Sequence, residues 1–176
     1  MRTGSGRTAF IVAVAIAAAT AGAYPEGAPW GAANPDADES CASCHHDYDP
    51  QTASAALRID GLPTAAIAGS SYALTIRLID DTAKTAGFQL VATGDGDAGR
   101  LSSEDTTIET AGPAARSTQP AMSESGANWS LDWQAPMAAG TEITFLLAAS
   151  SANDDQSPLG DRIHYRRWRV AVAADN

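Results

Sequence analysis

Apolar and polar side chains alternate along three short segments of this chain: residues 70–80, 129–133 and 142–149. A period of two residues is the pattern of a β-strand with one buried face. Leu74 and Ile76, for example, fall on one face, and Thr75 falls on the other. Less regular runs predict further strands, at residues 55–60, 87–93, 106–110 and 162–172.

The last of these segments changes its apolar face part-way along. Ile163 and Tyr165 begin on one face, whereas Val170 continues on the other. An extra residue in a strand produces such a switch, so the pattern predicts a β-bulge near Arg166 and Arg167.

The pattern as a whole predicts an all-β fold. About seven short strands are separated by loops rich in Gly, Pro, Asp and Ser, and no segment has the period of an amphipathic helix. This spacing favours an antiparallel two-sheet sandwich. Trp129 and Trp133 fall on the apolar face of their strand and are expected in the core. The widest gap, residues 94–128, predicts a long loop with one possible short strand.

The N-terminus predicts export from the cytoplasm. Met1–Arg7 is short and basic, residues 8–20 are apolar, and cleavage is expected after Ala23 of the small-residue run Ala21-Gly22-Ala23. The alternative is a retained membrane anchor, but the apolar run is shorter than the roughly 20 residues that a span needs. The expected domains are a signal peptide (1–23), a flexible leader with a cysteine box (24–52) and a β-sandwich (53–176). The mature protein is expected in the periplasm or outside the cell, with no membrane span.

The net charge of the chain argues against anionic partners. The formal net charge is −10, from 11 basic and 21 acidic residues. Cleavage would remove Arg2 and Arg7 and no acid, which leaves 9 basic and 21 acidic residues, or −12. A chain this acidic is a poor ligand for nucleic acid and is repelled by anionic membrane surfaces.

The only two cysteines lie in the box Cys41-Ala42-Ser43-Cys44-His45. This C-x-x-C-H spacing is the attachment motif of a c-type haem. Cys41 and Cys44 would form thioethers to one covalent haem, and His45 would be an axial iron ligand. The alternative is a Cys41–Cys44 disulfide with an incidental histidine. A zinc site would need at least one further ligand, such as His46 or His164.

Other segments resemble a known family. Gly87-Phe88-Gln89-Leu90, the run 129–136 (WSLDWQAP) and Gly160-Asp161-Arg162-Ile163 occur after the cysteine box in this order. With the strand 141–149, this layout resembles secreted reelin-domain-like proteins, also labelled choice-of-anchor V domain proteins, over residues 38–172. The resemblance implies an immunoglobulin-like β-sandwich, export and a haem at the box. Many members carry a histidine before the first tryptophan, where residues 116–119 of this chain have none, and many have a C-terminal anchor.

These observations leave several candidates for the second axial ligand of the iron. The candidates are Met122, Met137, His164 and His46. Met122 is favoured because it lies in the long gap, roughly where the family histidine is missing. His164 is the alternative, on a strand face opposite to that of Ile163 and Tyr165. An unfilled sixth position would instead allow small ligands to bind the iron.

Four of the nine mature basic residues cluster on the last strand: Arg162, Arg166, Arg167 and Arg169. They fit an edge strand that is protected by charge. A second interpretation is that one or two of them pair with haem propionates or with an acidic partner.

These features predict an exported monohaem c-type protein that transfers single electrons to or from a redox partner protein. No nucleophile–base set, phosphate loop or HExxH motif is present, so an electron carrier is favoured over a catalyst. One alternative is a non-enzymatic extracellular binding or adhesion module with a Cys41–Cys44 disulfide. Another is a haem-based sensor with an open iron position.

Overall fold

The computed structural model describes residues 24, 26–122 and 126–175. The predicted signal peptide, residues 1–23, lies outside these residues. The described chain contains one helical turn, α1 (Cys41–Cys44), and eleven strands. The strands are β1 (Leu57–Asp60), β2 (Ala65–Ile67), β3 (Ser71–Leu78), β4 (Thr85–Thr93), β5 (Arg100–Ser102), β6 (Ile108–Ala111), β7 (Ala114–Ser117), β8 (Ala121–Met122), β9 (Ala127–Gln134), β10 (Glu142–Ala152) and β11 (Arg162–Ala173). Within the described residues, no helix is long and apolar enough to span a membrane.

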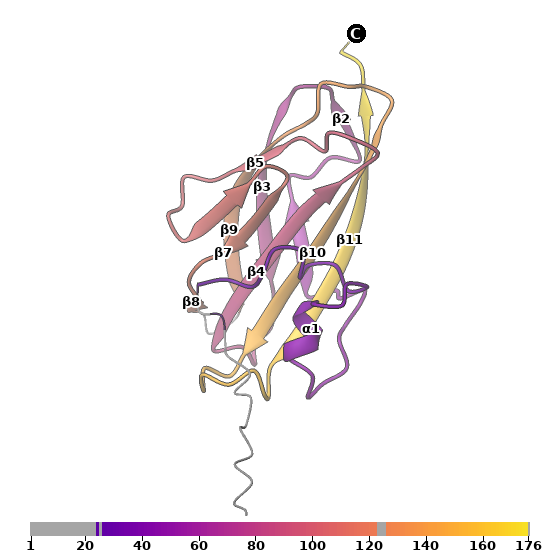
Figure 1. Cartoon of the computed structure of the whole chain (residues 1–176). Helices are drawn as coiled ribbons and strands as arrows, with labels where there is room; N and C mark the ends of the chain where they lie inside the picture. The colour runs from indigo at the N-terminus through magenta and orange to yellow at the C-terminus, as the bar shows by residue number, and fades with distance from the viewer. Residues whose placement is uncertain (1–23, 25, 123–125, 176) are drawn as a thin grey trace, which may run out of the picture.

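The strands form the predicted two-sheet sandwich (Figure 1). The four-stranded sheet has the order β1-β3-β9-β5. The seven-stranded sheet has the order β2-β11-β10-β4-β7-β6, with β8 paired to β4. All pairs are antiparallel except β2 with β11. The all-β prediction is therefore confirmed.

The core lies between the sheets and follows the alternation of the sequence. On β9, Trp129 and Trp133 are buried, and the intervening Ser130 is exposed. The ring of Trp133 meets Phe145 of β10 edge-on, with the two centroids 4.9 Å apart. Edge-to-face pairs of this kind add about 0.5–1.5 kcal/mol beyond the burial of their area. The prediction that both tryptophans belong to the core is confirmed.

The strand β11 is regular, and the predicted bulge is wrong. Its pairing with β10 runs without interruption from Ser151↔Arg162 to Glu142↔Ala171. Ile163 and Tyr165 are buried on the outer face of the seven-stranded sheet, whereas Val170 and Val172 face the core between the sheets. The apparent switch of face arises because the two ends of one regular strand are covered on opposite sides.

The gap 94–128 is not a single long loop. It contains β5, β6, β7 and β8, each of four residues or fewer. Only β6 matches the one short strand that the sequence predicts there. The others contain small or polar residues such as Ala114 and Ser117, so their hydrophobic pattern is weak.

The leader, which the sequence predicts to be flexible, packs against the sandwich along its described residues. Its described residues cross the outer face of the seven-stranded sheet near β4 and β10 (Figure 1). Ala32 and Ala33 are buried, and Ala33 packs in a small apolar cluster with Ala148, Ile163 and Tyr165. The outer face of an otherwise ordinary sandwich is therefore covered at this end by the N-terminal segment.

Candidate functional site

The cysteine box forms one turn of helix, α1. The N–H of Ser43 donates to the carbonyl of Ser40 (2.9 Å), and the N–H of His45 donates to that of Cys41 (3.2 Å). The N–H of Ser40 donates back to the Ser43 hydroxyl (3.1 Å), which closes the first turn. Residues three apart on a helix share a face, so the turn directs Cys41 and Cys44 to the same side.

Two contacts hold α1 on the sheet. The phenol of Tyr165, from the outer face of β11, accepts a hydrogen bond from the N–H of Ala42 (3.0 Å). The N–H of Cys41 donates to the carbonyl of Ala32 in the leader (3.1 Å). The box is thus positioned both by the last strand of the sandwich and by the segment that precedes it.

Gln89 fixes the leader itself. Its side chain is buried on the outer face of β4, and its amide oxygen accepts hydrogen bonds from the N–H groups of Gly31 and Ala33 (both 3.0 Å). Its amide nitrogen donates to the carbonyl of Pro29 (2.8 Å). One buried side chain therefore satisfies backbone groups that would otherwise be buried without partners.

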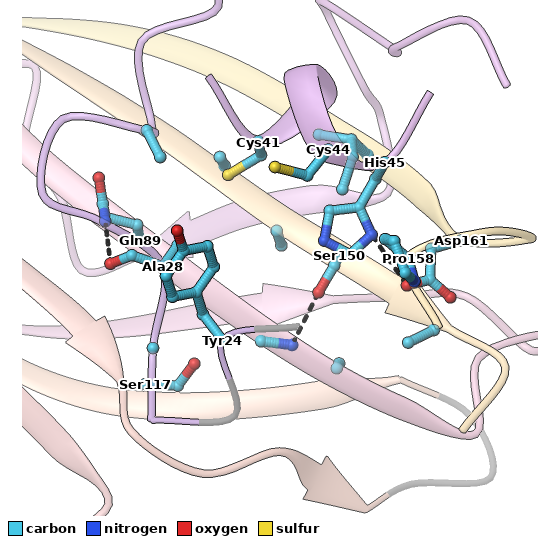
Figure 2. A pocket seen from close by; sticks show the side chains of 18 of the residues that line it. Tyr24, Ala28, Cys41, Cys44, His45, Gln89, Ser117, Ser150, Pro158 and Asp161 are labelled. Atoms are coloured by element: carbon cyan, nitrogen blue, oxygen red, sulfur yellow. Dashed lines mark hydrogen bonds and ion pairs between the residues drawn. The ribbon is translucent and has the colours of Figure 1, made fainter. Parts of the chain in front are cut away.

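A cavity of about 610 Å³ lies between the leader, α1 and the outer face of β4 and β10 (Figure 2). Its volume is within the range of about 300–1,000 Å³ that is typical of small-molecule and cofactor sites. The box residues Cys41, Cys44 and His45 contribute to one wall. Gly87, Ala148 and Ile163 provide a largely apolar floor from the outer face of the sheet. Ala86, Phe88 and Ala149 also border the cavity, but their side chains belong to the core between the sheets.

Asp161, the residue directly before β11, orients the imidazole of His45. Nδ1 of His45 lies 2.9 Å from Oδ2 of Asp161, whose side chain is only 4% exposed. This nitrogen is buried, and the carboxylate is off the N–H direction, so the contact is close but is not an aligned hydrogen bond. The other ring nitrogen points away from Asp161, toward the middle of the cavity (Figure 2).

The two thiols differ in their surroundings. Cys44 is exposed, whereas Cys41 packs against the apolar cluster of Ile163 and Tyr165. Burial raises the pKa of Cys41 from 9.0 to about 11, and the neighbouring Cys44 adds to the rise. A thiol that stays protonated at neutral pH is a poor nucleophile, so Cys41 is not the activated thiolate of a dithiol oxidoreductase.

The cavity is acidic. Its described lining includes four carboxylates, Glu39, Asp154, Asp155 and Asp161, and no lysine or arginine. The arginines of β11 are engaged elsewhere. Arg166 donates to the carbonyl of Leu57 (2.7 Å), and the others contact side chains outside the described lining: Arg162 on Tyr48, Arg167 on Asp36 and Arg169 on Glu142.

The structure separates the candidates for a second axial ligand. The main chain of Met122 lies in β8 and pairs with Thr85, which lines the cavity. His46 is exposed, and its Nδ1 lies 3.0 Å from the carbonyl oxygen of Cys44. Met137 is 77% exposed and lies against Gly69, away from the box.

His164 does not reach the cavity. It is buried on the side of β11 that faces the other sheet, opposite to the expected outer position. Both ring nitrogens have partners: Nδ1 lies 2.9 Å from the Ser54 hydroxyl, and Nε2 lies 3.1 Å from the Ser151 hydroxyl and 3.5 Å from Asp80. Within the described residues, no three His, Cys, Asp or Glu side chains form a cluster that could hold a metal ion.

Sequence reasoning missed three residues that shape the site: Asp161, Gln89 and Tyr165. Gln89 and Asp161 belong to short motifs that carried the family resemblance, but their sequence context assigned them no role. Alternation places Tyr165 on one apolar face of its strand and gives it no role at the box. Each contacts the box or the leader across more than 50 residues of sequence, so local patterns contain little signal for these contacts.

Comparisons with known proteins bear on the fold. The Reelin-N domain of F-spondin superposes with a TM-score of 0.51 and 19% identity, over 75% of this chain and 94% of that domain. The chain has a reelin-like β-sandwich fold. The human F-spondin reeler domain is also similar, with a TM-score of 0.48 and 19% identity over 69% of this chain and 95% of that domain. No family model matches the reelin-like chain, and no curated protein matches it.

Proposed function

We propose that this protein is an exported monohaem c-type electron carrier, with haem bound covalently through Cys41 and Cys44. The observation that carries the proposal is the placement of the box. A C-x-x-C-H turn borders a cavity with an apolar floor, and the free nitrogen of His45 points into that cavity.

The residues present fit a haem in most respects. The helical turn directs both thiols to one side, the apolar floor at Ala148 and Ile163 suits a porphyrin face, and His45 would ligate the iron. A bound haem would supply one-electron chemistry, while the chain sets ligation, exposure and docking. The described lining offers no lysine or arginine to pair with haem propionates, and its carboxylates would favour the ferric state.

Met122 is the proposed second ligand. It follows the cavity-lining residues Gln119 and Pro120, and its main chain pairs beside Thr85 at the cavity edge. A methionine opposite a histidine raises the reduction potential relative to two histidines. If Met122 binds iron, ferric protein will show the weak far-red charge-transfer band expected of methionine ligation, and Met122→Ala will abolish it. A band that persists in Met122→Ala excludes this ligand.

The proposed function also predicts a redox partner and a cellular compartment. The partner would be a redox protein that meets an exposed haem edge, since Cys44 is exposed and His45 is only partly buried. The compartment would be the periplasm or the outside of the cell, where c-type haem is attached after export.

A haem stain tests the proposal directly. The full chain is expressed in bacteria that are competent for cytochrome c maturation, and a denaturing gel is stained for haem peroxidase activity. We expect a haem band at the size of this chain that is absent from the Cys41→Ala/Cys44→Ala variant. An Asp49→Asn variant, changed in the exposed segment after the box, is the matched control and should retain the band.

The opposite result would support a different class of protein. If no haem is attached and the mass of the exported chain is lower by two hydrogens, the two cysteines form a disulfide. The chain would then be an extracellular binding or adhesion module, and the electron-carrier proposal would be rejected.

A further inference from the structure

A close contact with no assigned role joins the box to a residue 116 positions away. Oδ2 of Asp161 lies 2.9 Å from Nδ1 of His45, and the carboxylate is almost fully buried. A buried carboxylate is costly unless a partner compensates it. The second oxygen of Asp161 accepts a hydrogen bond from the N–H of Asn153 (3.2 Å), so the carboxylate is held at both ends.

The chain around Asp161 is held in place by its own turns. The N–H of Gly160 donates to the carboxylate of Asp47, two residues after His45 (2.8 Å). Gly160 has a φ of +84°, and a Cβ there would lie 2.6 Å from the Asn153 side chain, so only glycine fits. The side chains of Asn153 and Asp155 accept backbone N–H bonds within the same loop. Asp161 is therefore presented to His45 by a tightly turned loop.

This arrangement matches the chemistry of a metal-bound histidine. A ligating imidazole commonly donates its second N–H to a carboxylate, which fixes the tautomer and the ring orientation and makes the ligand more basic. In His45 the nitrogen beside Asp161 is Nδ1, which leaves Nε2 free for iron. Such contacts are often poorly aligned before the partner binds, so the off-axis carboxylate is compatible with this role.

We propose that Asp161 is the positioning residue of the haem site: its carboxylate fixes the Nδ1–H tautomer of His45, directs Nε2 at the iron and stabilises the ferric state. The inference rests on the proposed haem function and adds the residue that tunes it. It also gives the Gly160-Asp161-Arg162-Ile163 motif a physical role, in which Gly160 shapes the turn and Asp161 contacts the ligand.

The first test measures the reduction potential of haem-loaded protein. Asp161→Asn keeps the shape and the bond to the N–H of Asn153 but removes the charge next to His45. We expect it to raise the iron potential by about 59 mV or more, which is a tenfold change in a one-electron equilibrium. Asp154→Asn is the matched control, because Asp154 is an exposed cavity-lining carboxylate of the same loop, and asparagine tolerates its φ of +62°. The control should shift the potential by less than half as much.

The second test needs no haem and no variant of Asp161. In full-length protein from cells that lack cytochrome c maturation, ¹⁵N NMR of the His45 ring reports which nitrogen carries the proton of the neutral imidazole. We expect Nδ1–H in the wild-type chain, with the signal assigned by its loss in His45→Gln. A dominant Nε2–H form would overturn the inference.

The outcomes separate the two proposals. If the wild-type chain attaches no haem, the proposed function fails, and the positioning role falls with it. If haem is attached but Asp161→Asn and Asp154→Asn shift the potential equally, only the role of Asp161 fails. A large shift in Asp161→Asn alone, with the Nδ1–H tautomer, supports both.

Discussion

Gln89 shows how much of this site depends on one buried amide. Its oxygen accepts two N–H groups of the leader, and its nitrogen donates to a leader carbonyl. The residue lies on β4, where the apolar alternation of the strand continues on the inner face. The leader therefore owes its order to a side chain that follows it by more than 50 residues.

Replacing Gln89 with leucine should release the leader. Each buried N–H that loses its partner costs about 1–3 kcal/mol, so Gln89→Leu is expected to lower the free energy of unfolding by a few kcal/mol or to detach residues 26–40. Limited proteolysis should then cut the leader faster while the sandwich stays intact, and urea unfolding gives the cost in stability. Gln119→Leu, at an exposed cavity-lining position, is the control. Equal protection of the leader in both variants would contradict this role.

The raised pKa of Cys41 predicts an unreactive thiol before haem is attached. A pKa of about 11 instead of 9.0 reduces the thiolate fraction about a hundredfold at neutral pH. In haem-free Cys44→Ser protein, alkylation of Cys41 should therefore be about a hundredfold slower in the native state than in urea. The native rate should also keep rising with pH to about 11. A native rate that levels off near pH 9.0 would show that the thiol is not desolvated.

At the scale of elements, the strands with the clearest alternation could be predicted, and the rest could not. The strands β3, β9 and β10 each bury one face on the core, so their hydrophobic period is explicit. The short strands β2, β5, β7 and β8 have two to four residues each, too few to show a period. On β11 the period is regular, but burial on both faces by different neighbours made it look like a bulge.

The residues of the candidate site also divide into those that could be predicted from the sequence and those that could not. Cys41, Cys44 and His45 were identifiable because their chemistry depends on a local spacing. Asp161 directly precedes β11, and Tyr165 lies on it. Both therefore contact the box only after the chain has passed through the other strands of the sandwich. Such contacts follow from sheet order, which local hydrophobic patterns do not specify. The packed leader was missed for a related reason, since its partner Gln89 is a polar residue that faces outward from a strand.

The segment after the box is linked to the sandwich by the buried His164. Ser54 of this segment, Ser151 of β10 and Asp80 at the end of β3 all lie against the imidazole. Burial lowers the pKa of His164 below its ordinary value of 6.5, and the charge of Arg162 acts in the same direction, although Asp80 opposes them. Burial alone would raise the pKa of Asp80, but hydrogen bonds from Thr82 and Ser151 outweigh it and keep the net shift downward.

This cluster predicts that acid destabilises the fold. As pH falls below 6.5, the unfolded chain binds a proton at His164 while the folded chain still resists it, so the stability is present above 6.5 and is lost below it. Urea unfolding should show a decrease on the order of 1 kcal/mol between about pH 7.5 and pH 5.5. His164→Gln should flatten this dependence, whereas His46→Gln, at an exposed site, should leave it unchanged. The same slope in both variants would exclude His164 as its source.

At the scale of the whole molecule, net charge and the acidic cavity act together. The chain has a formal charge of −10, and the described cavity lining contains carboxylates without cations. A haem at this site would exchange electrons through a negative rim. Such a field attracts cationic partners and slows anionic ones, and salt screens it.

The haem-loaded protein should therefore react faster with a cationic small redox reagent than with an anionic one of similar potential. The difference should shrink as salt shortens the screening length from ~30 Å at about 0.01 M to ~3 Å at about 1 M. Stopped-flow mixing measures both rates. Asp154→Asn/Asp155→Asn should reduce the preference, and equal rates for the two reagents at low salt would argue against a negative docking rim.

The contact between α1 and β11 also sets an order of events during biogenesis. Ala42 reaches Tyr165 across 123 residues, so this wall of the cavity cannot close until β11 has formed and paired. If the chain is exported from its N-terminus, as we propose, the box would leave the membrane long before that strand. During this interval the thiol that is later buried would be open to enzymes of haem attachment, and folding of β11 would end their access.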